Sequence, residues 1–130
     1  MTETNNYSNS SAFNRSSMTV GKISPTDRLV AKIMKIVEKE FEDPTLNVKK
    51  LGEEKFFLTP DYLGRLFKRK TGLRINEYIC ICRIEKAKLY LLENKYKIYE
   101  VAKMCGFGNN AKHFSHVFKK YTGILPRDFK

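Results

Sequence analysis

The chain has 130 residues and carries 25 Lys and Arg against 14 Asp and Glu, which gives a formal net charge of +11. Its hydrophobic content of 42%, with nine Phe and seven Tyr, is enough for one packed core and excludes a wholly disordered protein. The positive charge favours an anionic partner, nucleic acid or a membrane surface, but no apolar run reaches the roughly eighteen residues of a membrane-spanning helix.

The first 23 residues differ in composition from the rest. They are rich in Asn, Ser and Thr, their apolar residues follow no period, and they do not resemble a secretory signal. We therefore expect residues 1–23 to be a disordered tail and residues 24–130 to fold. The three cysteines are an odd number without metal-type spacing, which predicts a reduced, cytoplasmic protein.

From Ser24 onward, apolar residues recur with a helical period and no stretch alternates as a strand does, so the fold class is predicted to be all-α. The first helix follows a Ser24 cap and ends at Pro44; its expected apolar stripe is Leu29, Ile33, Ile36, Val37 and Phe41. Further helices are predicted over about 48–55, from Pro60 to near Gly72, and over 75–93, 98–105 and 111–121, with a last turn after Pro126. These make about seven helices.

The long helix over 75–93 is expected to be the central one. Its apolar residues spread around much of its circumference, and they are Ile79, Cys82, Ile84, Ala87, Tyr90 and Leu91. Arg83 on this apolar helix is interpreted as a buried structural ion-pair partner, with Glu53 and Glu54 as candidate partners.

An internal repeat with an offset of 51 residues is the strongest signal. Residues 62–72 (YLGRLFKRKTG) align without gaps with residues 113–123 (HFSHVFKKYTG). Each copy follows a short amphipathic helix and a tight link, which is the pattern of a helix-turn-helix. Two copies indicate a two-lobed domain rather than a solenoid. The apolar positions of the repeat are assigned to the core: Leu63, Leu66, Phe67, Phe114, Val117, Phe118 and Tyr121.

The opposite faces of the two repeated helices carry polar or small residues. Asp61, Gly64, Arg65 and Lys68 follow helical spacing, and the offset maps them onto Lys112, Ser115, His116 and Lys119. A helix that reads DNA presents such a face to the major groove. A single face of this kind would be read as ordinary solvated surface, but two copies in a domain of charge +10 favour DNA.

These residues resemble a known family. Residues 62–68 (YLGRLFK) resemble the first recognition helix of AraC/XylS-type transcription regulators. Residues 98–107 and 114–126 resemble the second motif and the signature of that family, and residues 83–87 fit its central helix. The resemblance covers about residues 24–130. It implies a homeodomain-like fold with one helix-turn-helix subdomain over 24–74, a linker helix over 75–93 and a second subdomain over 94–130.

The resemblance also implies that both recognition helices enter successive major grooves on one side of the duplex. The central helix of 19 residues would be about 28 Å long, a similar scale to the 34 Å between successive major-groove faces. One chain would then bind an asymmetric site as a monomer. The sequence departs from the family at Gly52, where Ala is usual, with an expected weakening of about 1 kcal/mol. The turn 56–58 and the link 106–110 each look one residue long.

The predicted site consists of two groups of residues. Base contacts are expected from Asp61, Gly64, Arg65, Lys112, Ser115 and His116. Phosphate contacts are expected from Thr59, Lys68, Arg69, Asn110, Lys119 and Lys120. Arg65 is the best base-reading candidate because Arg suits a bidentate contact with guanine; its alternatives are a phosphate contact and a surface salt bridge. For Asp61, capping its own helix is favoured over accepting from cytosine, and Thr59 and Asn110 would also serve as plain caps.

No catalytic group, metal site or cofactor is predicted. His113, His116 and Cys105 lack further ligands at fitting spacing, and no glycine-rich loop follows a strand. The expected function is therefore a sequence-specific DNA-binding transcription regulator, an activator beside a promoter, with double-stranded DNA and RNA polymerase as partners. The alternatives are a non-specific nucleic-acid-binding accessory protein and a basic protein-interaction module. The tail is too short for a sensing domain, so we expect a stand-alone regulator or part of a longer protein.

Overall fold

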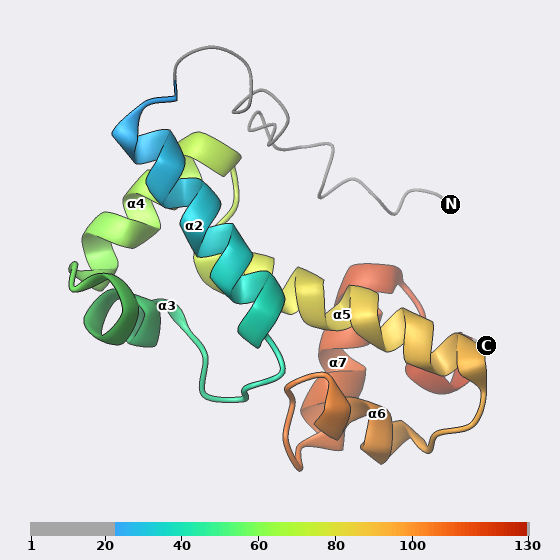
Figure 1. The fold of residues 1–130 in the computed structure, drawn as a ribbon. Coiled ribbons are helices and arrows are strands. Elements are labelled where there is room, and N and C mark those ends of the chain that lie inside the picture. Colours follow the sequence, from blue (N-terminus) through green and yellow to red (C-terminus); the bar gives the residue numbers. More distant parts are fainter. Residues whose placement is uncertain (1–22, 130) are drawn as a thin grey trace. The chain divides into compact units, whose positions relative to one another are not determined.

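A computed structural model describes residues 23–129, so the expectation of a disordered tail over 1–23 lies outside the described residues except for Ile23. Every regular element among these residues is helical, which confirms the all-α fold class (Figure 1). The elements are α2 (Pro25–Glu40), α3 (Val48–Lys50) with its π-helical continuation η2 (Leu51–Phe56), α4 (Pro60–Thr71), α5 (Ile75–Glu93), α6 (Ile98–Met104), α7 (Ala111–Thr122) and the 3-10 turn η3 (Pro126–Asp128). The six α-helices, η2 and η3 are close to the predicted seven helices, and α5 has the predicted bounds.

The described chain forms two compact units. One contains residues 23–39 and 45–79, and the other contains residues 40–44 and 80–129. The long helix α5 contributes its first turn to the first unit and the rest of its length to the second. Each unit holds one copy of the internal repeat.

The core of the first unit is built mainly by α2, α4 and the start of α5. The fully buried side chains include Val30, Ile33, Val37, Leu51, Leu63, Leu66, Phe67, Ile75 and Ile79. The predicted apolar stripe of α2 was partly wrong, because Val30 and Met34 are buried while Leu29 and Ile36 are only half-buried. Residues 30, 33, 34 and 37 follow the i, i+3, i+4, i+7 spacing of one helix face, whereas 29 and 36 flank that face. The Ser24 cap is confirmed, since its Oγ accepts from the Asp27 amide at 3.0 Å.

The second helix of the first unit begins at Val48 as predicted, but it widens into the π-helical η2. A π-turn accommodates one more residue than an α-turn, which accounts for the long link before α4. The link ends at Phe57, whose φ of 56° lies in the left-handed region although it is not glycine. The Leu58 amide then donates to the Gly52 carbonyl at 2.9 Å. The chain therefore folds back closely over Gly52.

Gly52→Ala is expected to destabilise the protein by about 1–2 kcal/mol, although Ala is the better helix former. A Cβ atom at Gly52 would lie 2.5 Å from the Leu58 carbonyl oxygen and 3.2 Å from the Pro60 nitrogen. Both neighbours are backbone atoms, so the turn itself must move. Urea unfolding measures the change. The control is Gly64→Ala, where the described residues leave 4 Å of open space; it should stabilise by about 0.5–1 kcal/mol. A gain at both positions would contradict the close approach.

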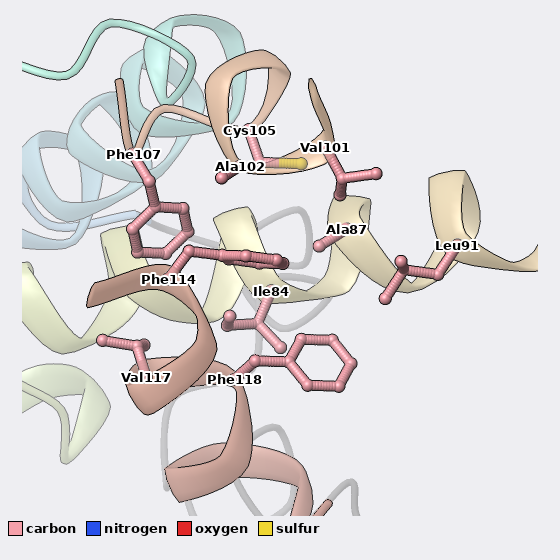
Figure 2. Packing of buried hydrophobic residues seen from close by; sticks show 10 residues of the cluster. All are labelled: Ile84, Ala87, Leu91, Val101, Ala102, Cys105, Phe107, Phe114, Val117 and Phe118. Carbon is pink, nitrogen blue, oxygen red and sulfur yellow. The ribbon is translucent and has the colours of Figure 1, made fainter. Parts of the chain in front are cut away.

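The core of the second unit is aromatic. Phe114, Val117 and Phe118 of α7 pack against α5 and α6, and Figure 2 shows the cluster, which also contains Ile84, Ala87, Leu91, Val101, Ala102, Cys105 and Phe107. The rings of Phe107 and Phe114 lie 5.1 Å apart, and those of Phe114 and Phe118 lie 5.7 Å apart. The matched apolar positions of the repeat are thus core residues in both units, except Tyr121, which is half-buried.

Arg83 is buried within the second unit, as predicted, but its partners are not Glu53 or Glu54. Its side chain is only 9% exposed. Nε donates to the Phe41 carbonyl at 2.8 Å and one terminal nitrogen donates to the Asp43 carbonyl at 2.9 Å. The guanidinium also lies 5.8 Å from the centre of the Phe107 ring. Burial lowers the pKa of Arg83, but an arginine stays charged in proteins. These bonds fix the loop 40–44 to the second unit.

Candidate nucleic-acid interface

The two repeated helices have matching N-terminal caps. The Thr59 side chain accepts from the Tyr62 amide at 3.1 Å at the start of α4. The Asn110 side chain accepts from the His113 amide at 3.0 Å at the start of α7. The two caps are 51 residues apart, so the offset read from the sequence holds at the first residue of each helix. Both residues act as caps, and each therefore marks a helix N-terminus at the predicted face.

The C-terminal ends of α4 and α7 match as well. Thr71 Oγ1 donates to the Phe67 carbonyl at 2.8 Å, and Thr122 Oγ1 donates to the Phe118 carbonyl at 2.8 Å. A glycine follows each threonine in the left-handed conformation, with φ of 82° and 88°. Each helix thus has twelve residues, and equivalent side chains leave equivalent positions. The offset of 51 between the two repeated helices therefore holds from the cap to the end of each helix.

The predicted face of α4 lies outside the core. Asp61, Arg65 and Lys68 are exposed and Gly64 is half-buried. Arg65 Nε lies 3.2 Å from Asp61 Oδ2, and the two side chains are 79% and 72% exposed. The cap hydrogen bond of α4 comes from Thr59 and not from Asp61. The Asp61 carboxylate lies in the first turn, where it suits the helix dipole, and pairs with Arg65 one turn along. The salt-bridge alternative for Arg65 is present, in the form of a solvent-exposed pair.

The predicted face of α7 has the same exposure but different charges. Lys112, His116 and Lys119 are exposed and Ser115 is half-buried. The first turn of α7 contains no acidic residue, whereas that of α4 contains Asp61. The expected base-contact residues therefore gather on two separate helix faces, one of mixed charge and one purely basic or neutral.

The expected phosphate-contacting cations lie near the C-terminal ends of these helices. Lys68 and Arg69 on α4 and Lys119 and Lys120 on α7 are all exposed. Lys70 differs, because its Nζ lies 3.0 Å from Asp27 Oδ1 on α2. The hydrogen bond from Lys70 lowers the pKa of Asp27, with a further contribution from Ser24. Lys70 is thus held against its own unit while its neighbours extend into solvent.

A groove of about 350 Å³ runs beside the predicted face of α4. It is lined by Asp61, Gly64, Arg65 and Lys68 together with residues that were not predicted to belong to the site: Val48, Pro60, Arg74, Ile75, Asn76 and Glu77. The Asn76 side chain accepts from the Val48 amide at 3.2 Å and so ties α5 to the start of α3. Arg74 brings a third cation to the groove. The internal repeat could have indicated residues 74–76 of this groove. They follow the helix-ending Gly72 at the same distance as residues 125–127 follow Gly123.

Equivalent hollows lie beside α7. One of about 280 Å³ is lined by Ile98, Ser115, Leu125, Pro126 and Arg127, and another of about 520 Å³ by Ser115, His116, Lys119, Lys120 and Leu125. Ile98 occupies the place that Val48 has in the first unit, at the start of the helix before the recognition helix. Both units therefore have a hollow beside the polar face of the repeated helix.

The remaining reactive side chains do not form a catalytic arrangement within the part of the chain that the structure describes. Cys105 is buried in the core, and this burial raises the pKa of its thiol to about 12. The His113 ring packs against Phe107 at 5.8 Å. Across residues 23–129, no three His, Cys, Asp or Glu side chains gather as metal ligands would.

The helices that the structure describes include none with the length and hydropathy needed to cross a membrane.

Comparison with known proteins gives consistent matches. Residues 54–130 match the family described as "Helix-turn-helix domain". The chain is 38% identical over 103 residues to the uncharacterized transcriptional regulatory protein YesN of Bacillus subtilis, a match that covers 78% of this chain and 28% of that protein. The chain thus spans less than a third of the length of that relative.

Two solved structures share the fold. The C-terminal domain of AraT, a response regulator from Geobacillus stearothermophilus, has a TM-score of 0.75 and 28% identity, covering 84% of this chain and 86% of that one. The C-terminal domain of the two-component response regulator YesN from Fusobacterium nucleatum has a TM-score of 0.74 and 34% identity, covering 78% and 97%. Since the helix-turn-helix match extends over more than half of its length, the chain belongs to the AraC/XylS-type helix-turn-helix family.

Proposed function

We propose that this chain binds a specific site on double-stranded DNA through α4 and α7, placed in successive major grooves, and so regulates transcription. The observation that carries the proposal is the pair of equivalent helices. Each has its apolar face buried, its N-terminus capped by a side chain and its polar face exposed beside a groove. The net charge of +11 suits a polyanion. The family is a class of transcription regulators rather than of enzymes.

The residue roles in this proposal follow the exposed faces. Asp61, Gly64, Arg65, Lys112, Ser115 and His116 face the bases, and Thr59, Lys68, Arg69, Asn110, Lys119 and Lys120 face phosphates. The functional parts are the subdomains 24–74 and 94–130, joined by the helix 75–93. Because the two reading faces differ in sequence, one chain would bind an asymmetric site as a monomer.

The wider role is also part of the proposal. The resemblance implies an activator that acts beside a promoter and meets RNA polymerase there, in the cytoplasm, where bacterial relatives encounter DNA. The titles of the two solved relatives describe C-terminal domains of response regulators. By the same logic, this chain would be the DNA-reading part of a regulator.

Selection of duplexes from a random library tests the proposal most directly. A specific regulator should enrich one asymmetric sequence, and each key base-pair substitution in it should cost about 1–3 kcal/mol of binding free energy. A non-specific nucleic-acid binder would enrich no sequence and would respond little to substitution. A protein-interaction module would show no salt-sensitive duplex binding at all. Either result would contradict the proposal.

Arg65→Ala and Lys119→Ala should have different effects on binding. Arg65→Ala should relax the preference at one base position, with a loss of about 1–3 kcal/mol there, because a bidentate contact with guanine is removed. Lys119→Ala should weaken binding to all duplexes alike and reduce the salt dependence. Competition binding with singly substituted duplexes measures both effects. Equal, sequence-independent losses from the two variants would remove Arg65 from the reading role.

A further inference from the structure

The Asp61–Arg65 ion pair is the main chemical difference between the two reading faces. On α4, the acid precedes the arginine by one helical turn and binds its Nε at 3.2 Å. At the equivalent positions of α7, the chain has Lys112 and His116. The first turn of α4 is therefore acidic and that of α7 is not, although both helices would approach the same polyanion.

The fold gives only a modest reason for an acid at position 61, because a carboxylate in the first turn of α4 interacts favourably with the helix dipole. The cap of α4 is already supplied by Thr59. Both side chains of the pair are more than 70% exposed, and exposed ion pairs of this spacing add little to stability. A carboxylate on a DNA-facing helix turn also repels phosphates. The dipole would be served by any acid of the first turn, whereas the contact of Asp61 with Arg65 is specific to this position one turn before the arginine.

We propose that Asp61 is a positioning residue that holds the Arg65 guanidinium ready for one guanine. The contact with Asp61 uses Nε, which leaves the two terminal amino groups with four of the five N–H donors of the guanidinium. Two of these donors match the O6 and N7 acceptors of guanine in the major groove. Because the long side chain is partly ordered before binding, less conformational entropy is lost when the contact forms. This inference rests on the proposed function.

The difference between the two faces also predicts different roles for α4 and α7 in DNA binding. The α7 face has two lysines and a histidine but no acid that could orient them. Its contribution is expected to be mainly sequence-independent affinity. Discrimination between bases is expected to depend more on α4, where Asp61 lowers the attraction for any phosphate and sharpens the contact with one base.

The test uses the full chain and the duplex that it selects from a random library. Binding is measured to this duplex, to one in which the G·C pair sensed by Arg65→Ala is replaced by A·T, and to an unrelated duplex. Asp61→Ala should lower the discrimination between the first two duplexes about three- to tenfold, in line with the ordering cost of one long side chain. It should at the same time raise affinity for the unrelated duplex.

Matched variants separate positioning from charge. Asp61→Glu keeps an (i, i+4) acid–arginine pair and should retain most of the discrimination. Glu85→Ala removes the acid of an (i, i+3) helical pair with Lys88, in which the Glu85 side chain is 55% exposed and neither residue lines a groove beside a reading face, so it should leave discrimination unchanged. In the double variant Asp61→Ala/Arg65→Ala, the loss of discrimination should equal that of Arg65→Ala alone. Thermal unfolding of each variant shows whether α4 remains folded.

Two results would overturn the inference, and they differ from failure of the proposed function. If Arg65→Ala abolishes discrimination but Asp61→Ala leaves it intact, Arg65 reads the base without Asp61. If Asp61→Ala lowers discrimination further in the Arg65→Ala background, Asp61 acts on the DNA directly. If neither variant changes discrimination, the base-reading role of Arg65 in the proposed function is itself wrong.

Discussion

Gly106→Ala is expected to destabilise the protein by about 4 kcal/mol, the largest loss anticipated for a single methyl group in this chain. The backbone at Gly106 has a φ of 99°, which side chains other than glycine rarely adopt. A Cβ atom there would collide with the Phe41 carbonyl oxygen and would lie 2.7 Å from Arg83 Nε. These two atoms are hydrogen-bonded to each other at 2.8 Å. The methyl group can therefore be accommodated only by breaking the bond that holds the loop 40–44.

Gly123→Ala is the matched control for this prediction. Its φ of 88° is similar, but no other described residue comes within 4 Å of the position of a Cβ atom. Only backbone strain remains there, so the expected loss is about 1 kcal/mol. Urea unfolding, followed by far-ultraviolet circular dichroism, gives the two free energies. Similar losses at the two glycines would mean that the contact with Phe41 and Arg83 is unimportant.

The contact at Gly106 also matters for how the chain is organised. Residues 40–44 belong to the second unit, whereas the residues on both sides of them in the sequence belong to the first. The resemblance implies a first subdomain over 24–74, which includes residues 40–44, and a linker helix that joins it to the second subdomain. Arg83 holds this loop within the second unit, because its guanidinium donates to the Phe41 and Asp43 carbonyls, and Gly106 leaves the space that this contact needs.

The elements predicted best from the sequence are those with local end signals. Thr59-Pro60 and Gly72 set the limits of α4, and Asn110 and Gly123 set those of α7. Caps and helix-ending glycines depend on hydrogen bonds within a few residues, so they are visible in a short stretch of sequence. The gapless repeat then fixed which side chains share a face, and the exposure of the two predicted faces follows from it.

The features that were missed depend on longer-range contacts or on competing signals. The partners of Arg83 lie 42 and 40 residues away and are backbone carbonyls, which no side-chain pattern reveals. The π-helix of η2 depends on the way the next turn returns to Gly52. The stripe of α2 was ambiguous because Leu29 and Ile36 are as apolar as Val30 and Met34. By contrast, the Asp61–Arg65 pair has the spacing typical of helical ion pairs, and a surface salt bridge was an alternative for Arg65, although a role at the helix N-terminus was favoured for Asp61.

Raising the salt concentration from 50 to 200 mM is expected to weaken specific binding by about 150-fold. Four exposed cations (Lys68, Arg69, Lys119 and Lys120) are proposed to contact phosphates, and each contact releases condensed counterions. Four contacts give a slope of about −3.6 in a plot of log affinity against log salt. A protein-interaction module would show no such dependence, and a much steeper slope would mean that further cations, Arg74 among them, also contact the backbone.

The double variant Lys68→Ala/Lys119→Ala removes one proposed phosphate contact from each recognition helix, at equivalent positions of the repeat. The slope should then fall to about −1.8, and the same rise in salt should cost only about twelvefold. Lys70→Ala is the control, because the Lys70 ammonium is held by Asp27 of its own unit at 3.0 Å and should release no counterions from DNA. Titrations of one duplex at four salt concentrations measure all three slopes. A slope unchanged in the double variant would place the phosphate contacts elsewhere on the surface, while a slope lowered by Lys70→Ala would show that net charge, rather than position on α4 and α7, governs binding.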